Sequence, residues 1–295
     1  MRNEKEMMDL IISVAKKDDR IRAVYMNGSR ANPNVEKDIF QDYDIVYVVK
    51  ETESFINNKN WITIFGEIAI LQLPDDNDNA MGGKWGGNHD FSRSYAWLML
   101  FKDGNRIDLG IEIIENAIDN FSGDYDKLTI ILLDKDNILP KCLSPTDIDY
   151  WIKKPTKEEY YAYCNNFWWC LNNVAKSIAR DELPYVMWMF NVVVRENFEK
   201  MIEWYIGMSN DFSFSAGKQG KYFKKYLSVD LYNMYKETFS DSEYKNIWAA
   251  VFKMCDLFII IANKVGEHFG FEYNKNEEKN IIEYLNWVKN KIKQK

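Results

Sequence analysis

Two aspartates stand two residues apart at the start of an apolar segment, in the run Asp42-Tyr43-Asp44-Ile45-Val46-Tyr47. Side chains alternate along a strand, so Asp42 and Asp44 share one face and lie about 7 Å apart along it. Two carboxylates on one face repel each other unless a cation or protons lie between them. Mg²⁺ binds carboxylate oxygens and usually keeps water or phosphate oxygens as further ligands. The pair therefore predicts a magnesium site at the end of a buried strand.

A third carboxylate, Asp108, lies early in the later β-rich segment Arg106–Ile113. By the same alternation, Arg106, Asp108, Gly110 and Glu112 share one face of that segment. If this strand neighbours the one that begins at Tyr43, Asp108 completes a cluster of three carboxylates. Such a cluster can hold two divalent ions roughly 3.5 to 4 Å apart, the arrangement used for phosphoryl chemistry.

A turn that suits phosphate follows the first apolar segment, at Gly28-Ser29-Arg30. Glycine lets the backbone turn and approach a ligand closely. Ser29 offers a hydroxyl and a backbone N–H group in the manner of an anion nest, and Arg30 adds a positive charge. A surface salt bridge is an equally good interpretation of Arg30. The sequence thus predicts a phosphate-binding edge facing the metal-binding edge.

These motifs resemble the nucleotidyltransferase superfamily that has the polymerase-β-type catalytic domain. The shared pattern reads Asn27-Gly28-Ser29, twelve residues, then Asp42-Tyr43-Asp44-Ile45, with Asp108 in Arg106-Ile107-Asp108-Leu109. Asn27 departs from the family's apolar preference. The longer runs at residues 25–32, 41–45 and 106–109 resemble the aminoglycoside 6-adenylyltransferases, and the likeness continues into residues 203–207 and 217–221 of the C-terminal half.

The resemblance implies ATP as donor, Mg²⁺ as cofactor and the 6-hydroxyl of streptomycin as acceptor. Asp42 and Asp44 are then metal ligands, and Asp108 is a metal ligand, the general base, or both.

Streptomycin carries guanidinium groups, so carboxylates and aromatic faces are its natural partners. The candidates for the drug are Trp85, Glu196 and Glu203, with the acidic residues 75–78. The candidates for the β- and γ-phosphates are Arg195, Lys218 and Lys221. The run Gly217-Lys218-Gln219-Gly220-Lys221 lacks the Walker A spacing, so a plain interhelical loop is as good an interpretation.

Two domains are expected, in an α+β fold: a nucleotidyltransferase domain over 1–148, with a mixed β-sheet flanked by helices, and a helical substrate-binding bundle over 149–295. Residues 4–17 show helical periodicity, and Asp103-Gly104 predicts a hairpin. Residues 74–90 are expected to form a long mobile loop. The predicted strands are 21–27, 43–49, 67–73, 94–101, 106–113 and 128–133. The predicted C-terminal helices are 158–180, 184–206, 230–238, 242–268 and 277–293.

Composition narrows the function classes. The net charge of −7 disfavours a nucleic-acid partner, and the four cysteines have neither zinc-site nor disulfide spacing, which suits a reducing cytoplasm. No apolar run suggests a membrane partner. We expect a cytoplasmic protein, with a monomer favoured, that binds an aminoglycoside and ATP. The alternatives are another acceptor (a different aminoglycoside, a lincosamide or a protein side chain) and a non-catalytic nucleotide sensor.

Overall fold

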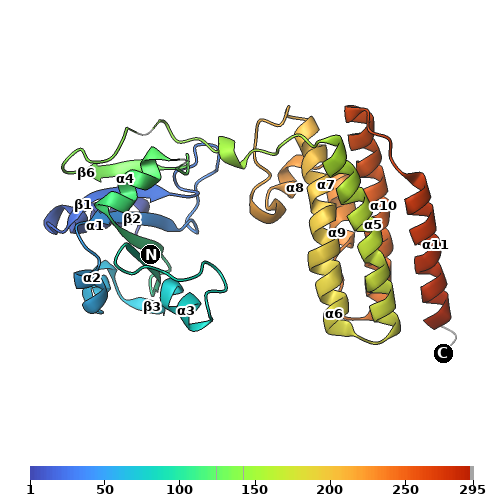
Figure 1. The fold of residues 1–295 in the computed structure, drawn as a ribbon, viewed down its shortest axis with the longest axis horizontal. Coiled ribbons are helices and arrows are strands. Elements are labelled where there is room, and N and C mark those ends of the chain that lie inside the picture. The colour runs from blue at the N-terminus through green and yellow to red at the C-terminus, as the bar shows by residue number, and fades with distance from the viewer. Residues whose placement is uncertain (124, 142, 293–295) are drawn as a thin grey trace. The chain divides into compact units, whose positions relative to one another are not determined.

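The computed structural model describes residues 1–123, 125–141 and 143–292, and it divides into two compact units, Met1–Asp149 and Tyr150–Lys295 (Figure 1). The strands of the first unit are β1 (Ile21–Asn27), β2 (Tyr43–Val49), β3 (Ile68–Gln72), β4 (Ser94–Phe101), β5 (Arg106–Ile113) and β6 (Ile130–Asp134). Its helices are α1 (Glu4–Lys17), α2 (Glu53–Asn57), α3 (Pro74–Ala80) and α4 (Ile114–Ser122), with 3-10 turns η1 (Trp61–Phe65) and, at the division, η2 (Ile148–Tyr150).

The six strands form one mixed sheet in the order β3-β4-β5-β2-β1-β6. Only the central pair, β2 and β5, is parallel; every other neighbouring pair among these strands is antiparallel. The hairpin predicted at Asp103-Gly104 joins β4 to β5, and Gly104 takes the positive φ that its turn requires. This unit is the mixed sheet with flanking helices that the sequence predicted.

The two faces of the sheet carry different residues because side chains alternate along each strand. One face is apolar along its whole length: Tyr43, Ile45 and Tyr47 of β2 pack in a core that also contains Met7 and Ile11 of α1. The opposite face is covered at one end, where α4 folds back directly after β5 and its Ala117 and Phe121 pack near Val48. Asp44 and Asp108 belong to the opposite face at its other end, and both remain partly exposed.

The second unit is helical: α5 (Lys157–Ala179), α6 (Leu183–Trp188), a π-helical segment η3 (Met189–Val194), α7 (Arg195–Met208), η4 (Lys218–Gly220), α8 (Phe223–Tyr226), α9 (Val229–Glu237), α10 (Tyr244–Phe269) and α11 (Lys275–Ile292). Helix α5 begins with a capping box between Thr156 and Glu159, which satisfies two otherwise free backbone N–H groups. Stacked rings of Phe167 and Phe258, 3.7 Å apart at their centroids, join α5 to α10 in the core.

Helix α10 is long and apolar enough to cross a bilayer by length and composition, and 56% of its most apolar window is buried inside the unit. Its buried residues belong to the same core cluster as those of α5 and α7. The burial gives α10 the character of the central helix of a bundle, where an all-round apolar surface is expected.

The structure corrects two details of the predicted elements. Residues 74–80 form helix α3, whereas the sequence analysis placed them in a loop; Pro74 stands in its first turn, where its missing N–H costs nothing. The single helix expected over 184–206 contains the π-helical segment η3, which ends before Arg195. The expected α+β fold, with a sheet first and helices after it, is confirmed.

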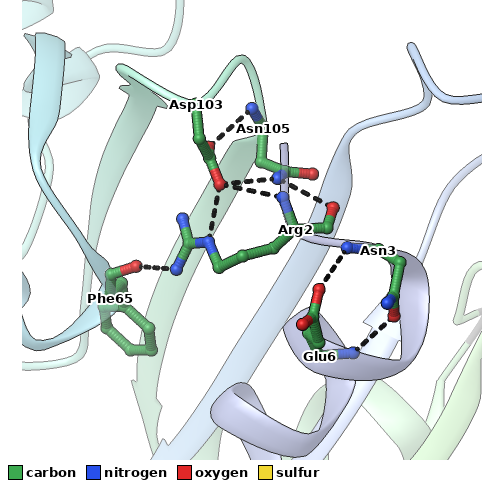
Figure 2. Close-up of polar contacts among 6 residues, drawn as sticks. All are labelled: Arg2, Asn3, Glu6, Phe65, Asp103 and Asn105. Carbon is green, nitrogen blue, oxygen red and sulfur yellow. Dashed lines mark hydrogen bonds and ion pairs between the residues drawn. The ribbon is translucent and has the colours of Figure 1, made fainter.

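The N-terminus is tied to the β4–β5 turn by a cluster of polar contacts (Figure 2). The Nε of Arg2 donates to Asp103 over 2.7 Å, and the backbone N–H of Arg2 donates to the same carboxylate. A second guanidinium nitrogen donates to the carbonyl of Phe65, and the amide of Asn105 donates to the carbonyl of Arg2. The guanidinium of Arg2 holds the pKa of the Asp103 carboxyl well below its usual range. Since β5 begins directly after Asn105, these contacts fix the strand that carries Asp108.

We predict that Arg2→Ala lowers the free energy of unfolding at pH 7 by about 1 to 2 kcal/mol, the usual range for charge-assisted hydrogen bonds that are only half buried. Because the pKa of Asp103 is lowered in the folded state, the stabilisation is present above the usual aspartate pKa and is lost as the pH falls below it. Denaturant titrations at pH 7 and pH 3 measure both effects.

The matched control is Lys5→Ala, which removes an ion pair with Asp9 whose two side chains are 85% and 64% exposed. An exposed pair of this kind contributes little to stability. A loss for Arg2→Ala no larger than that for Lys5→Ala would contradict the structural role of the N-terminal contacts.

Candidate active site

Asp44 of β2 and Asp108 of β5 lie directly opposite each other in the parallel pair. Neighbouring strands are about 4.8 Å apart, so the two carboxylates leave the sheet side by side. Asp42 precedes the first residue of β2 and shares the face of Asp44 by alternation. The backbone thus brings the three sequence-predicted aspartates to one place, at the uncovered end of the sheet.

The side chain of Arg106 lies among these carboxylates. Its Nε and one terminal nitrogen donate to the two oxygens of Asp108, each over 2.7 Å, and its other terminal nitrogen lies 3.4 Å from Asp42. Asp108 is therefore turned onto the guanidinium. Within residues 1–123, 125–141 and 143–292, no three carboxylate, thiol or imidazole groups lie close enough to enclose an ion. The three aspartates are adjacent, but their side chains do not converge on a common point.

Crowding of like charge shows in the titration of the cluster. Burial, together with the charges of Asp108 and Asp42, raises the pKa of Asp44 from its usual value near 4 to about 6. Burial also raises the pKa of Asp42, and Arg106 opposes that rise. The carboxylates together hold more negative charge than one guanidinium offsets, so this end of the sheet favours an additional cation or protons.

The turn after β1 closes the site on the side of Asp44. Gly28 has φ +76°, and a methyl group at its Cα would stand 2.1 Å from an oxygen of Asp44. Any side chain at position 28 would thus displace the carboxylate as well as strain the backbone. Ser29 follows at a partly exposed position of the same turn.

Arg30 lies under this turn with its side chain only 4% exposed. Its guanidinium donates to the backbone carbonyls of Asp42 and Gln41, over 3.0 and 2.8 Å, and stacks 3.8 Å from the ring centre of Tyr43. These contacts give Arg30 a structural role: they fix the backbone that leads into β2 and so place Asp42.

The remaining candidates for the phosphates lie in the second unit. Arg195 is buried, donates to the side chain and carbonyl of Thr238, and stacks on Phe239, so its guanidinium serves the packing of its own unit. Lys218 and Lys221 are exposed on and just after η4, where Gly217 and Gly220 both have positive φ. Of the three, only the lysines present their charge to solvent.

The candidates for the drug are distributed over both units. Trp85 is 66% exposed on the loop after α3, and its backbone N–H donates to the buried carboxylate of Asp78. That carboxylate also contacts His89 over 2.9 Å, which fixes the loop. Glu196 is exposed on α7, whereas Glu203 is half buried and paired with Lys200.

Sequence reasoning did not assign Arg106 to the site. The alternation that put Asp108 on the active face put Arg106 there as well, and this was the available signal. Glu112, the other acid on that face of β5, is buried and accepts hydrogen bonds from Tyr25, Asn116 and Asn120. Because all three donors hold its carboxylate, Glu112 anchors the covered end of the strand and does not join the aspartate cluster.

The residues present suit a divalent cation of the magnesium type. The donors are hard carboxylate oxygens, the ligand class that Mg²⁺ prefers, and Asp44 and Asp108 stand in register on neighbouring strands. Asp42 and Asp44 would hold the ion, and Asp108 would join them once it leaves Arg106.

Comparison with known proteins shows the family of this chain. The family model described as streptomycin adenylyltransferase matches residues 1–288. The chain belongs to this family. It is 35% identical to the aminoglycoside 6-adenylyltransferase of Staphylococcus aureus, over 97% of this chain and 98% of that protein. It is 37% identical to that of Bacillus subtilis, over 94% and 95%. A crystal structure of an aminoglycoside 6-adenyltransferase from Bacillus subtilis covers 98% of this chain and 99% of its own, with 32% identity and a TM-score of 0.47.

The aspartates at the uncovered end of the sheet and the glycine turn beside them are compatible with membership of an adenylyltransferase family. A nucleotidyl transfer needs the triphosphate to be neutralised and an acceptor hydroxyl to be brought close to it. Arg106 on the aspartates is a feature that the family name alone does not predict.

We predict that Gly28→Ala lowers kcat/KM by about a hundredfold or more, since a displacement of roughly 1 Å at a reacting centre has that effect. Gly270→Ala is the matched control: its φ is +71°, and a methyl group there would meet no atom within 4 Å. Both variants carry the same backbone strain, and only Gly28→Ala moves the Asp44 carboxylate. Equal activities would contradict the role given to Gly28.

A second prediction concerns pH in the presence of a chelator. Because the folded-state pKa of Asp44 is raised to about 6, folding binds a proton there between pH 4 and 6, and stability falls as the pH rises through this window. Asp44→Asn should therefore melt at a higher temperature than the unsubstituted protein at pH 7, and the difference should shrink toward pH 4. A difference that does not change with pH would contradict the crowding of charge at this position.

Proposed function

We propose that this protein transfers AMP from ATP to a hydroxyl of an aminoglycoside, with the 6-hydroxyl of streptomycin as the acceptor, and releases pyrophosphate. One observation carries the proposal: Asp44 and Asp108 stand in register on neighbouring strands, with Asp42 on the same face and Gly28-Ser29 beside Asp44. A carboxylate cluster next to a glycine turn can hold a metal-bound triphosphate on one side and an attacking hydroxyl on the other.

In the reaction, the acceptor oxygen forms a bond to the α-phosphorus of ATP, the bond from that phosphorus to the bridging oxygen of pyrophosphate breaks, and the hydroxyl proton passes to a carboxylate. Bound Mg²⁺ would neutralise the triphosphate and make the acceptor hydroxyl more acidic. Asp42 and Asp44 hold the nucleotide end of the site. Asp108 is the carboxylate that accepts the proton, because it lies one strand further from the glycine turn.

The phosphates would lie against Gly28 and Ser29, where backbone N–H groups and a hydroxyl are accessible. Lys218 and Lys221 are the proposed partners of the β- and γ-phosphates. Arg30 supports the site through the packing described above, whereas Arg195 packs within its own unit. Most of the rate enhancement then comes from positioning and neutralisation of charge, as phosphoryl-transfer chemistry requires.

The acceptor would be recognised through its guanidinium groups and its flat apolar ring faces. Trp85 offers an exposed aromatic face on a loop that Asp78 fixes, and Glu196 offers an exposed carboxylate. Glu203 would have to leave Lys200 before it could take a ligand. A guanidinium group is stabilised by contact with a tryptophan face and, separately, by a carboxylate.

The direct test is mass spectrometry of streptomycin after incubation with enzyme, ATP and Mg²⁺. We expect a product heavier by one adenylyl group, and one pyrophosphate released for each product molecule. If the wild-type enzyme leaves streptomycin unchanged but modifies another aminoglycoside, a lincosamide or a protein, then that molecule is the acceptor and streptomycin is not. Nucleotide binding without pyrophosphate release, with any acceptor, would favour a nucleotide sensor.

Asp108→Asn is the control variant within the same experiment. It keeps the size of the side chain and removes its basicity, so we expect it to bind ATP and Mg²⁺ and to form product at least about a hundredfold more slowly, the usual contribution of a general base. Turnover close to that of the wild type would remove Asp108 from the role of base.

A further inference from the structure

Arg106 occupies the position in which the aspartates would receive a cation. Its guanidinium donates one hydrogen bond to each oxygen of Asp108 and lies within 3.4 Å of Asp42. The pair formed with Asp108 has the bidentate geometry that makes an arginine–carboxylate contact strong. The carboxylate that must join a metal site is thus held by a positive charge that belongs to the protein itself.

Arg106 and a divalent ion compete for these carboxylates. Asp108 uses both of its oxygens on the guanidinium, and two positive groups within one carboxylate cluster repel each other. The cluster is also unsuited to being left without a cation, because Asp44 and Asp108 stand in register on neighbouring strands and their charges repel each other. One cation must therefore leave as the other arrives.

The exposure of the two arginines near the site separates their roles. The side chain of Arg106 is 43% exposed, whereas that of Arg30 is 4% exposed and is fixed to backbone carbonyls. Arg106 stands at the first position of β5, next to the solvent-exposed end of the sheet. It can rotate away from Asp108 without breaking a core contact, and Arg30 cannot.

We propose that Arg106 is a placeholder cation: it holds Asp42 and Asp108 in the metal-free protein and gives them up when a divalent ion binds. Arg106 is then a positioning residue that acts through the carboxylates. The proposal rests on the proposed function, since it needs a metal to bind at the aspartates. It adds that the affinity for the metal is set by competition with a side chain of the same strand.

Competition of this kind predicts that removal of the guanidinium tightens metal binding. We expect Arg106→Gln to bind Mn²⁺, in the absence of nucleotide, about tenfold more tightly than the wild type, within the range usual for coupling between sites. A residue with a purely structural role would have the opposite effect, because loss of its support would loosen the carboxylates and weaken binding. The fraction of free Mn²⁺, followed by its electron paramagnetic resonance signal, measures the affinity directly.

Two further variants sharpen the test. Arg106→Lys keeps the charge but cannot fork onto both oxygens of Asp108, so its Mn²⁺ affinity should lie between those of the wild type and Arg106→Gln. Arg22→Gln removes a similar pair of hydrogen bonds to Asp136, at 2.6 and 2.5 Å, from strand β1 of the same sheet, and should leave the affinity unchanged. Melting curves in chelator establish that each variant is folded.

The outcomes separate this proposal from the proposed function. If the wild type binds Mn²⁺ and Arg106→Gln binds it with equal or lower affinity, the placeholder role is wrong. The metal-dependent transfer would still stand. Failure of every variant to bind Mn²⁺, with or without a non-hydrolysable ATP analogue, would overturn both. Tighter binding in Arg106→Gln together with unchanged binding in Arg22→Gln is the result that the structure leads us to expect.

Discussion

Repulsion between carboxylates on two parallel strands is the constraint on which this structure depends. The register of β2 and β5 fixes Asp44 opposite Asp108, and the strand alternation adds Asp42 to the same face. Strand spacing places Asp44 and Asp108 about 5 Å apart, so the folded chain must supply protons or a cation there. Two other features of the site answer this need: the contact of Arg106 with Asp108 and the open end of the sheet. Burial, together with the neighbouring charges, raises the pKa of Asp44.

The positions of the carboxylates could be predicted from the sequence because they depend on backbone periodicity. Alternation put Asp42 and Asp44 on one face, and the Asp103-Gly104 turn gave the hairpin that carries Asp108.

Side-chain pairing could not be predicted in the same way. Tertiary contacts within a few ångströms decide whether Asp108 pairs with an ion or with Arg106. Contacts of the same kind bury Arg30 under its own turn. Helix α3 was missed because its acidic, polar sequence lacks an apolar stripe, and the π-helical segment because periodicity averages over it.

The first unit has stabilising contacts around the site, and these contacts hold the aspartates in position. Arg2 ties the N-terminus to the turn before β5, Arg30 fixes the backbone before β2, and Glu112 anchors the far end of β5 with three donors. Between these fixed points, the aspartates themselves are destabilising in the absence of a cation. This division is common at catalytic centres, where strained or repelling groups are kept in place by the surrounding structure.

The most direct measurement of the central claim is anomalous diffraction from crystals grown with Mn²⁺ and a non-hydrolysable ATP analogue. We expect an anomalous peak about 2.2 Å from carboxylate oxygens of Asp42 and Asp44, next to the turn at Gly28, with Asp108 released from Arg106. A peak elsewhere in the chain, or a loaded site in which Arg106 still forks onto Asp108, would contradict it.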